Sequence, residues 1–259
     1  MDNQPTGNRN PDNQPIGNRK PDNRPIGVFD SGLGGLTAVK ELEKILPRES
    51  IVYFGDTGRV PYGTRSRETI RRYAAQDMAF LMNHDVKAVL AACGTVSSTA
   101  GDIGRNLPVP YFDVIGPSAK AAAGLTKNKK VGVIGTSATI HSDAYRQALL
   151  GIDYKLEVYS QACPLFVPLV ENAFISPQEE VTRLVAQRYL GPVREAGVDT
   201  LILGCTHYPI IAPIIASVMG HSVSLVDAGR EAALALAGRL AEDGLLCGEG
   251  NPRSAAFFV

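Results

Sequence analysis

The chain has 259 residues, 44% of them hydrophobic, and its 26 Lys and Arg residues balance 26 Asp and Glu residues. This balance shows none of the basic excess typical of nucleic-acid-binding proteins, and no apolar stretch reaches membrane-spanning length. Four cysteines in a chain of this size, without a CxxC pair, do not indicate a disulfide framework or a metal site. We therefore expect a reduced, globular, cytoplasmic protein that binds neither nucleic acid nor membranes.

The first 25 residues contain three copies of the motif DN(Q/R)P(T/I)G with a period of ten. The first two copies have almost no apolar side chains and are rich in Pro, Gly and Asn. Such a segment cannot bury enough apolar surface to offset the entropy lost on ordering, so we predict a disordered tail over residues 1–25. The simpler interpretation of the repeat is that the original N-terminal segment of the protein was duplicated, and the alternative is that the tail is a regulatory arm.

From residue 26 onward, short apolar runs alternate with helix-like stretches, which predicts parallel sheets covered by helices. In the first half, strands are predicted at 26–30, 50–56, 86–93 and 108–114, and helices at 35–47, at 66–85 and directly after residue 93. Ser66 and Thr69 suit the first turn of the second helix.

The second half repeats this order. Its predicted strands lie at 129–136, 154–163, 198–205 and 221–229, and its predicted helices at 139–151, 176–197 and 209–220, with an interruption near Gly191 and Pro192. A last helix over 229–244 is expected to pack on the first half. We predict an α/β fold of two similar lobes, each a mainly parallel sheet flanked by helices, related by a pseudo-twofold axis with the active site between them. The first lobe would comprise residues 26–115 and 226–259, and the second residues 116–225.

Five polar or reactive side chains stand at the carboxyl ends of predicted strands, where open α/β sheets bind their ligands: Asp30, Asp56, Cys93, Thr136 and Cys205. If the two lobes face each other, these strand ends share one cleft. The two cysteines, in "LAACGTVSST" and "LILGCTHYP", would then approach a ligand from opposite sides.

Two facing thiols are suited to acid–base chemistry at carbon. A free thiol has a pKa of about 8.5, and a helix N-terminus lowers it. We therefore expect both strand-to-helix turns to favour the thiolate. A thiolate on one face of a carbon acid can remove a proton while a thiol on the other face supplies one, which inverts the stereocentre without a cofactor.

The same residue types also allow simpler interpretations. A single cysteine in an apolar strand is more often a small buried hydrophobe, and Cys163 and Cys247 keep that interpretation. "DSGLGG" at 30–35 suggests a dinucleotide-binding turn, but the third glycine of GxGxxG would fall on Thr37. By pattern alone, Glu171 is a charge at a helix end. His84 and His221 are expected on surface turns.

Six stretches together resemble the glutamate racemases, cofactor-independent bacterial isomerases that interconvert L- and D-glutamate for peptidoglycan, and hence for cell wall biogenesis and cell shape. They are "FDSGLGG", "FGDTGRVPYG", "AACGT", "VGVIGTSATIHSDAY", "ACPLFVPLVE" and "ILGCTHYP". The resemblance extends from about Ile26 to Leu240. "GCTHYP" favours glutamate over aspartate racemases, which usually carry an acid after GCT. The resemblance implies a two-lobed α/β fold, no cofactor, a small-molecule substrate and a homodimer.

The resemblance also implies residue roles. Cys93 is similar to the base that deprotonates D-glutamate, and Cys205 to its partner for L-glutamate. Asp30 corresponds to an assisting acid on the Cys93 side, and Glu171 and His207 to groups assisting Cys205. The positions similar to substrate-contacting ones are Ser31, Pro61, Tyr62, Gly63, Gly94, Thr95, Thr136, Thr139 and Thr206. No residue is expected to bind a metal.

One position departs from the family pattern. The family usually has CNT(A/S) around the first cysteine, whereas this chain has Cys93, Gly94, Thr95 and Val96. Loss of the Asn side chain removes a hydrogen bond to a charged group, worth about 1.5–3 kcal/mol. This predicts weaker activity, a changed substrate preference, or a non-catalytic amino-acid-binding or regulatory protein on the same scaffold. If the lost contact is the whole effect, Gly94→Asn should raise activity.

Overall fold

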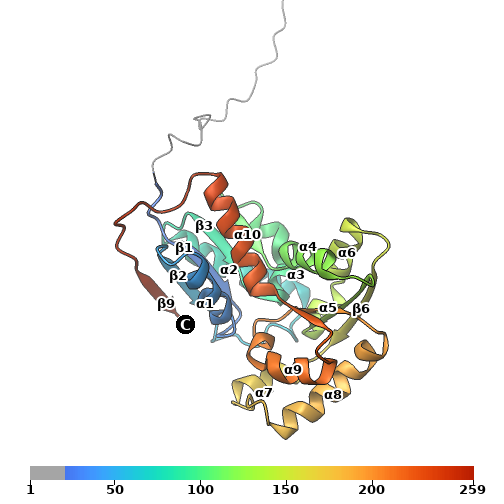
Figure 1. Cartoon of the computed structure of the whole chain (residues 1–259). Coiled ribbons are helices and arrows are strands. Elements are labelled where there is room, and N and C mark those ends of the chain that lie inside the picture. Colours follow the sequence, from blue (N-terminus) through green and yellow to red (C-terminus); the bar gives the residue numbers. More distant parts are fainter. Residues whose placement is uncertain (1–20) are drawn as a thin grey trace, which may run out of the picture.

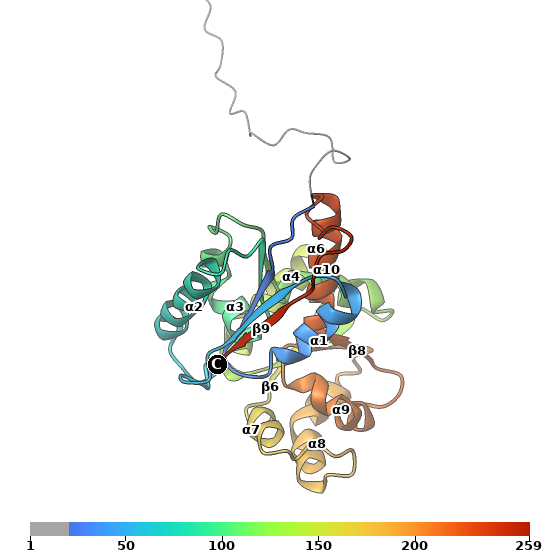
Figure 2. The same cartoon turned by 90° about the vertical axis from the view of Figure 1, so that its left-hand side faces the viewer.

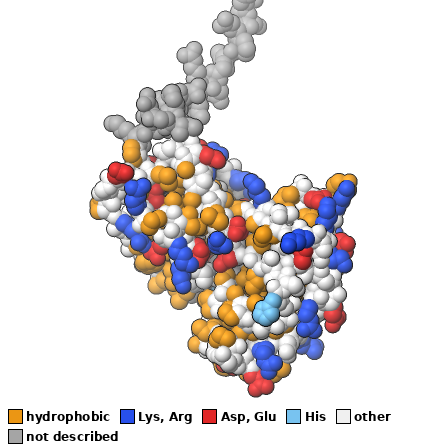
Figure 3. Space-filling view, in the orientation of Figure 1, with side chains coloured by type: hydrophobic (Ala, Val, Ile, Leu, Met, Phe, Trp, Pro, Cys, Tyr) orange, Lys and Arg blue, Asp and Glu red, His pale blue; other side chains and the backbone are white. Residues whose placement is uncertain are grey.

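The structure is a computed structural model that describes residues 21–259 (Figure 1). The tail predicted over residues 1–25 lies outside the described residues, except for its last five. Among the helices of residues 21–259, none has both the length and the apolar character of a membrane span. On the face shown in Figure 3, basic and acidic side chains are interspersed, and no broad area of one sign is visible.

The first sheet has five parallel strands in the order β4-β3-β1-β2-β9. They are β1 (Ile26–Asp30), β2 (Ile51–Gly55), β3 (Ala88–Ala91), β4 (Tyr111–Asp113) and β9 (Ala255–Phe258). Every residue of β1 and β3 is buried, as expected for inner strands that are covered on both faces. This sheet and the helices that pack on it form the first lobe.

The second sheet has four parallel strands in the order β6-β5-β7-β8. They are β5 (Lys130–Gly135), β6 (Glu157–Ala162), β7 (Thr200–Leu203) and β8 (Ser224–Asp227). With its helices this sheet forms the second lobe. The predicted α/β fold of two lobes is confirmed, and the alternation of strand and helix that predicted it is visible along the colour gradient of Figure 1.

Helices cover both sheets and also join them (Figures 1 and 2). The α-helices are α1 (Leu36–Ile45), α2 (Arg67–Met82), α3 (Gly94–Gly104), α4 (Ile115–Leu125), α5 (Ser137–His141), α6 (Ala144–Ile152), α7 (Phe166–Glu171), α8 (Glu180–Glu195), α9 (Ala212–Met219) and α10 (Ala228–Glu242), and η2 (Tyr208–Ile211) is a 3₁₀ helix. The last helix, α10, packs against α1 as expected, and also against α4.

One hydrophobic cluster runs through both lobes. It contains Val28 and Leu90 from the first sheet, Val133 and Ile202 from the second, and Leu236 from α10, all fully buried. Burial of such side chains contributes about 1.5–3 kcal/mol each, so this shared core is a large part of what keeps the lobes together.

Several elements differ from the sequence-based prediction. The helix expected over 139–151 is broken, because Asp143 adopts a left-handed conformation with φ 59° between α5 and α6. The interruption predicted near Gly191 and Pro192 is wrong, since α8 continues through Pro192. The helix predicted over 209–220 begins as the 3₁₀ helix η2 before α9. Neither α4 nor β9 was predicted from the sequence, and α7 was indicated only by the expected helix end at Glu171.

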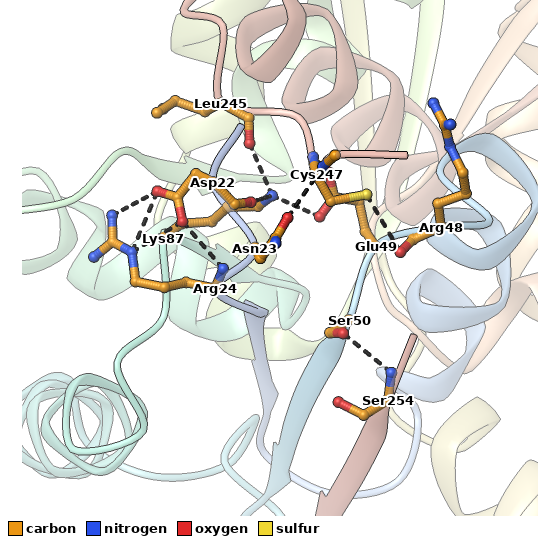
Figure 4. Close-up of polar contacts among 11 residues, drawn as sticks. Asp22, Asn23, Arg24, Arg48, Glu49, Ser50, Lys87, Leu245, Cys247 and Ser254 are labelled. Carbon is orange, nitrogen blue, oxygen red and sulfur yellow. Dashed lines mark hydrogen bonds and ion pairs between the residues drawn. The ribbon is translucent and has the colours of Figure 1, made fainter. Parts of the chain in front are cut away.

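A buried ion pair connects four segments of the first lobe that are distant in the sequence (Figure 4). The Lys87 side chain is fully buried, and its Nζ lies 2.6 Å from Oε2 of Glu49. The same Nζ donates to the backbone carbonyls of Asp22 at 2.7 Å and Leu245 at 2.8 Å. The other Glu49 oxygen accepts a hydrogen bond from the backbone N–H of Cys247 at 2.9 Å. The segment before β1 is therefore held against the segment that follows α10.

Candidate functional site

The turn after β1 is built around a buried carboxylate. Asp30 ends β1 and is fully buried, and its Oδ2 accepts hydrogen bonds from the backbone N–H groups of Gly32 (3.2 Å) and Gly35 (3.0 Å). Its other oxygen faces the hydroxyl of Thr206 at 3.5 Å, across the gap between the lobes. A Cβ on Gly34 would lie only 2.4 Å from the Thr206 hydroxyl oxygen. The glycine-rich turn therefore lies directly against the second lobe.

Cys93 follows β3 and is the N-terminal capping residue of α3. Its side chain is buried, and its Sγ lies 3.4 Å from the hydroxyl of Ser31. Burial raises the pKa of the Cys93 thiol to about 12, and the negative charge of Asp30 acts in the same direction. The hydrogen bond with Ser31 offsets only part of this rise.

Cys205 occupies the corresponding position after β7, and it is also buried. Its Sγ lies 3.9 Å from Nδ1 of His207, and Nε2 of that histidine lies 3.1 Å from Oε1 of Glu171. An ionised carboxylate only accepts hydrogen bonds, so in the neutral imidazole this contact puts the proton on Nε2, and Nδ1 is then an acceptor facing the sulfur. Glu171 is the last residue of α7, the helix-end charge that the sequence indicated, and its side chain is 43% exposed.

The expectation that both turns favour the thiolate does not hold in this structure. Burial raises the pKa of Cys205 as well as that of Cys93, and the hydrogen bond that the backbone N–H of His207 donates to Cys205 offsets this rise only partly. Desolvation shifts the pKa of a fully buried group by up to about 3–5 units. A helix terminus contributes about 0.3–1 kcal/mol, which corresponds to less than about one pKa unit. Burial, which the sequence pattern did not quantify, therefore outweighs the helix N-terminus.

A chain of threonine hydroxyls crosses the gap between the lobes. Thr95 Oγ1 lies 2.9 Å from Thr136 Oγ1, which in turn lies 3.0 Å from Thr139 Oγ1. The Thr136 hydroxyl also caps the N-terminus of α5 by accepting from the backbone N–H of Thr139. A second crossing contact runs from the hydroxyl of Thr37 to the carbonyl of Thr206 at 3.0 Å. These contacts hold the two cysteine-bearing turns close together.

The wall around Tyr62 rests on a buried charged cluster. The Tyr62 hydroxyl contacts carboxylate oxygens of Asp56 and, at 2.9 Å, of Asp77, and Arg59 pairs with both carboxylates. Burial raises the pKa of the Asp77 carboxyl, in the middle of α2, to about 7. Asp56 was expected at a strand end, whereas nothing in the sequence pattern singled out Arg59 or Asp77, because their partners are set by tertiary contact.

One cavity of about 160 Å³ lies between the lobes and collects most of the expected site residues. The expected residues that line it are Ser31, Pro61, Tyr62, Gly63, Cys93, Gly94, Thr95, Thr136, Glu171, Cys205, Thr206 and His207. Ligand pockets of drug-sized molecules span roughly 300–1,000 Å³, so this volume suits a small metabolite rather than a dinucleotide.

Two expected residues do not line the cavity. Asp30 is buried behind it, and Thr139 reaches it only through Thr136. Six lining residues were not anticipated: Val60, Thr64, Ser137, Pro164, Val167 and Pro168. They adjoin, or lie within, the stretches "VPYG", "GTS" and "ACPLFVPLVE", so the signal that could have found them is proximity to those motifs.

The remaining cysteines and histidines lie outside the cavity. Cys163 and Cys247 are buried, with sulfurs facing the carbonyls of Gln161 and Arg48 respectively. His84 follows α2 and packs on Phe80, and His221 is exposed. Among residues 21–259, no three His, Cys, Asp or Glu side chains are gathered so that they could hold a metal ion.

Comparison with known proteins identifies similar sequences over most of the chain. The profile of the family described as Asp/Glu/Hydantoin racemase matches residues 26–236. A glutamate racemase of Geobacter metallireducens is 49% identical over 208 residues, which cover 80% of this chain and 76% of that protein. A glutamate racemase of Neisseria meningitidis serogroup C is 47% identical over 235 residues, covering 90% and 86%.

Solved structures agree with the sequence comparison. The crystal structure of a glutamate racemase isoform from Bacillus anthracis has a TM-score of 0.86 and 37% identity, and the match covers 90% of this chain and 87% of that one. The glutamate racemase of Francisella tularensis, crystallised with D-glutamate, has a TM-score of 0.84 and 44% identity, with coverage of 91% and 88%. The similarity therefore extends through both lobes.

Proposed function

Since this chain belongs to the Asp/Glu/Hydantoin racemase family, we propose that it is a glutamate racemase that uses Cys93 and Cys205 as its two acid–base groups. The observation that supports this mechanism best is that both thiols line the same small cavity, one at the end of β3 and the other at the end of β7. Glutamate racemases at 47–49% identity support the choice of substrate.

The reaction proposed needs no external redox partner and no cofactor. From D-glutamate, the Cys93 thiolate takes the Cα proton and becomes a thiol, which leaves a carbanion at Cα. The Cys205 thiol then gives its proton to the opposite face, which yields L-glutamate and a Cys205 thiolate. The reverse reaction exchanges the two roles.

The buried thiols must be activated when substrate binds, because burial raises the pKa of both. The positive ammonium group of the amino acid favours a thiolate beside it. We assign Asp30 to assist Cys93, and His207 with Glu171 to assist Cys205. His207 is suited to this role because its Nδ1 faces the sulfur as an acceptor.

The substrate carboxylates are proposed to bind to hydroxyls and backbone N–H groups at the strand ends and helix starts. The proposed polar contacts come from Ser31, Tyr62, Gly63, Gly94, Thr95, Thr136 and Thr206, all of which line the cavity. Pro61 lines it too, but has neither a hydroxyl nor an N–H and so offers the substrate an apolar contact. Thr139 acts by orienting the Thr136 hydroxyl. The product D-glutamate would supply peptidoglycan synthesis in the cytoplasm, with the enzyme acting as a homodimer.

The decisive experiment uses circular dichroism to monitor racemisation of L- or D-glutamate by the purified protein, with no added cofactor. In D2O, the enantiomer formed should carry deuterium at Cα, and product without label would contradict proton transfer through solvent-exchanged thiols. Cys93→Ala and Cys205→Ala should each lower kcat by about 10²–10⁴-fold, the range for loss of a general acid–base group. Cys247→Ala, outside the cavity, is the matched control and should keep full activity.

A second candidate is a weakened or non-catalytic glutamate-binding protein on the same scaffold. It is favoured by Gly94, which lacks the amide side chain that the family usually has at this position. Thermal stabilisation by glutamate without any turnover would support the non-catalytic form of this candidate, and measurable turnover would exclude binding as the sole role. A panel of other amino acids followed by chiral chromatography tests for a changed substrate preference.

A further inference from the structure

Gly94 and Gly204, which lie next to the two cavity cysteines in the sequence, are in close contact with each other. Gly94 directly follows Cys93, and Gly204 directly precedes Cys205. A Cβ placed on Gly94 would lie 2.1 Å from the carbonyl oxygen of Gly204 and 3.7 Å from the hydroxyl of Thr139. A Cβ essentially never lies within 3.0 Å of such an atom, so no side chain fits at position 94 in this arrangement of the lobes.

The obstruction cannot be relieved by a rotating side chain, because the obstructing atom belongs to the backbone. Gly204 is itself fixed: its N–H donates to the carbonyl of Ile134 on β5 at 2.8 Å. A Cβ on Gly204 would lie 2.7 Å from that same carbonyl oxygen. Relief therefore requires the turn of the first lobe to move away from the turn of the second, by about 1 Å or more.

We propose that Gly94 is a positioning residue: its missing side chain lets the two cysteine-bearing turns touch, and this contact sets the separation of the two thiols. The proposal rests on the function proposed above, in which both sulfurs must reach one carbon atom. Gly94 is thus a spacing residue as well as a position that has lost an amide.

Two further contacts between the lobes also depend on this short distance between the cysteine-bearing turns. The Thr95 hydroxyl, one residue further along, lies 2.9 Å from that of Thr136 in the second lobe. A Cβ on Gly63 would lie 2.9 Å from the Cβ of Thr136. If residue 94 had a side chain, these crossing contacts would lengthen together, because they join the same two rigid lobes.

The geometry reverses the effect expected of Gly94→Asn from sequence. The Asn amide would bring back a polar group, but its Cβ would meet the Gly204 carbonyl first. Gly94→Ala has the Cβ without the amide and so isolates the steric effect. Gly191→Ala is the matched control, since Gly191 lies within α8 and a Cβ there would meet nothing within 4 Å.

The first measurement does not depend on catalysis. Alkylation by iodoacetamide is followed at each cysteine by mass spectrometry, with Cys163 as an internal reference, because it is fully buried and outside the cavity. In Gly94→Ala and Gly94→Asn, lobes held apart expose Cys93 and Cys205, whose alkylation rates should rise several-fold. The Cys163 rate should stay unchanged, which also checks that each lobe remains folded. Gly191→Ala should match the wild type at every site.

The second measurement is kinetic. A displacement of about 1 Å between reacting groups costs on the order of 100-fold in rate, so Gly94→Ala should lose about that much in kcat with a smaller change in KM. In D2O, the ratio of labelled starting enantiomer to labelled product should rise, because one thiol still exchanges the proton while the opposite thiol reaches Cα less often.

Different outcomes test the spacing role of Gly94 and the proposed racemase function. Unchanged alkylation and unchanged kcat in Gly94→Ala would overturn the spacing role, and so would a gain of activity in Gly94→Asn. Wild-type protein without any racemisation would instead overturn the proposed function. The alkylation comparison would then still report whether residue 94 controls the closure of the lobes.

Discussion

Nε2 of His207 lies 3.1 Å from a carboxylate oxygen of Glu171, and this contact connects the turn after β7 to the end of α7. The carboxylate orients the imidazole so that its other nitrogen faces the sulfur of Cys205. An orienting partner of this kind determines which tautomer a catalytic histidine adopts.

Glu171→Gln tests this orientation. Gln keeps a similar shape but removes the charge and can rotate its amide, so proton transfer at Cys205 should slow and that at Cys93 should not. The two enantiomers have equal free energy, so kcat/KM must stay equal in both directions. The informative quantity is the primary isotope effect, which should increase with α-deuterated L-glutamate and decrease with α-deuterated D-glutamate.

The control for this variant is Glu180→Gln, an exposed glutamate at the start of α8. It should leave both isotope effects unchanged. Equal changes for the two enantiomers in Glu171→Gln would contradict a role confined to the Cys205 side.

Asp30→Asn should make Cys93 easier to ionise and yet slow racemisation. The negative charge of Asp30 contributes to the raised pKa of Cys93, so removing it lowers that pKa. The Asn carbonyl can still accept the hydrogen bonds from Gly32 and Gly35, which keeps the turn folded. Alkylation of Cys93 at mildly alkaline pH should accelerate, while kcat should fall because the assisting carboxylate is lost.

Asp153→Asn removes a half-buried carboxylate that pairs with Lys129 outside the cavity, and it should change neither rate. An unchanged alkylation rate in Asp30→Asn would show that Asp30 does not influence the Cys93 thiol.

Asp77 should make the protein less stable as the pH rises towards neutrality. Its pKa is raised to about 7 in the folded state, chiefly by burial, whereas an unfolded aspartate has a pKa of about 3.9. The folded state therefore binds a proton more tightly, and its stability is lost as the pH rises from about 4 through about 7. Urea unfolding across this window should show a decline that is reduced in Asp77→Asn. A decline of the same size in that variant would rule out Asp77 as its source.

Removing one member of the Lys87–Glu49 pair should destabilise the first lobe. Lys87→Met leaves the Glu49 carboxylate buried without its cation, which costs about 3–5 kcal/mol in the free energy of unfolding. The double variant Lys87→Met with Glu49→Leu should recover part of this loss, because no unpaired charge remains. Neither residue lines the cavity, so racemisation by folded protein should be unchanged. A double variant less stable than Lys87→Met alone would contradict this account.

The alternation of strands and helices could be predicted from the sequence because it depends on local periodicity and turn residues. The same reasoning placed Cys93 and Cys205 at strand ends, where β3 and β7 indeed stop. It did not find β9, a four-residue strand whose pairing with β2 depends on residues about 200 positions apart in the chain. The division of the chain into lobes at residues 115 and 225 stays a prediction, as does the role of each site residue.

The sequence by itself determined the class of fold, the family and the strand ends that carry the two thiols, because these depend on hydrophobic pattern and on motifs read along the chain. Only the tertiary structure decided how close the two turns lie, that burial raises the pKa of both thiols, and that His207 faces Glu171. Those properties depend on distances and desolvation between segments far apart in the chain, and a side chain as small as the one missing from Gly94 is enough to change them.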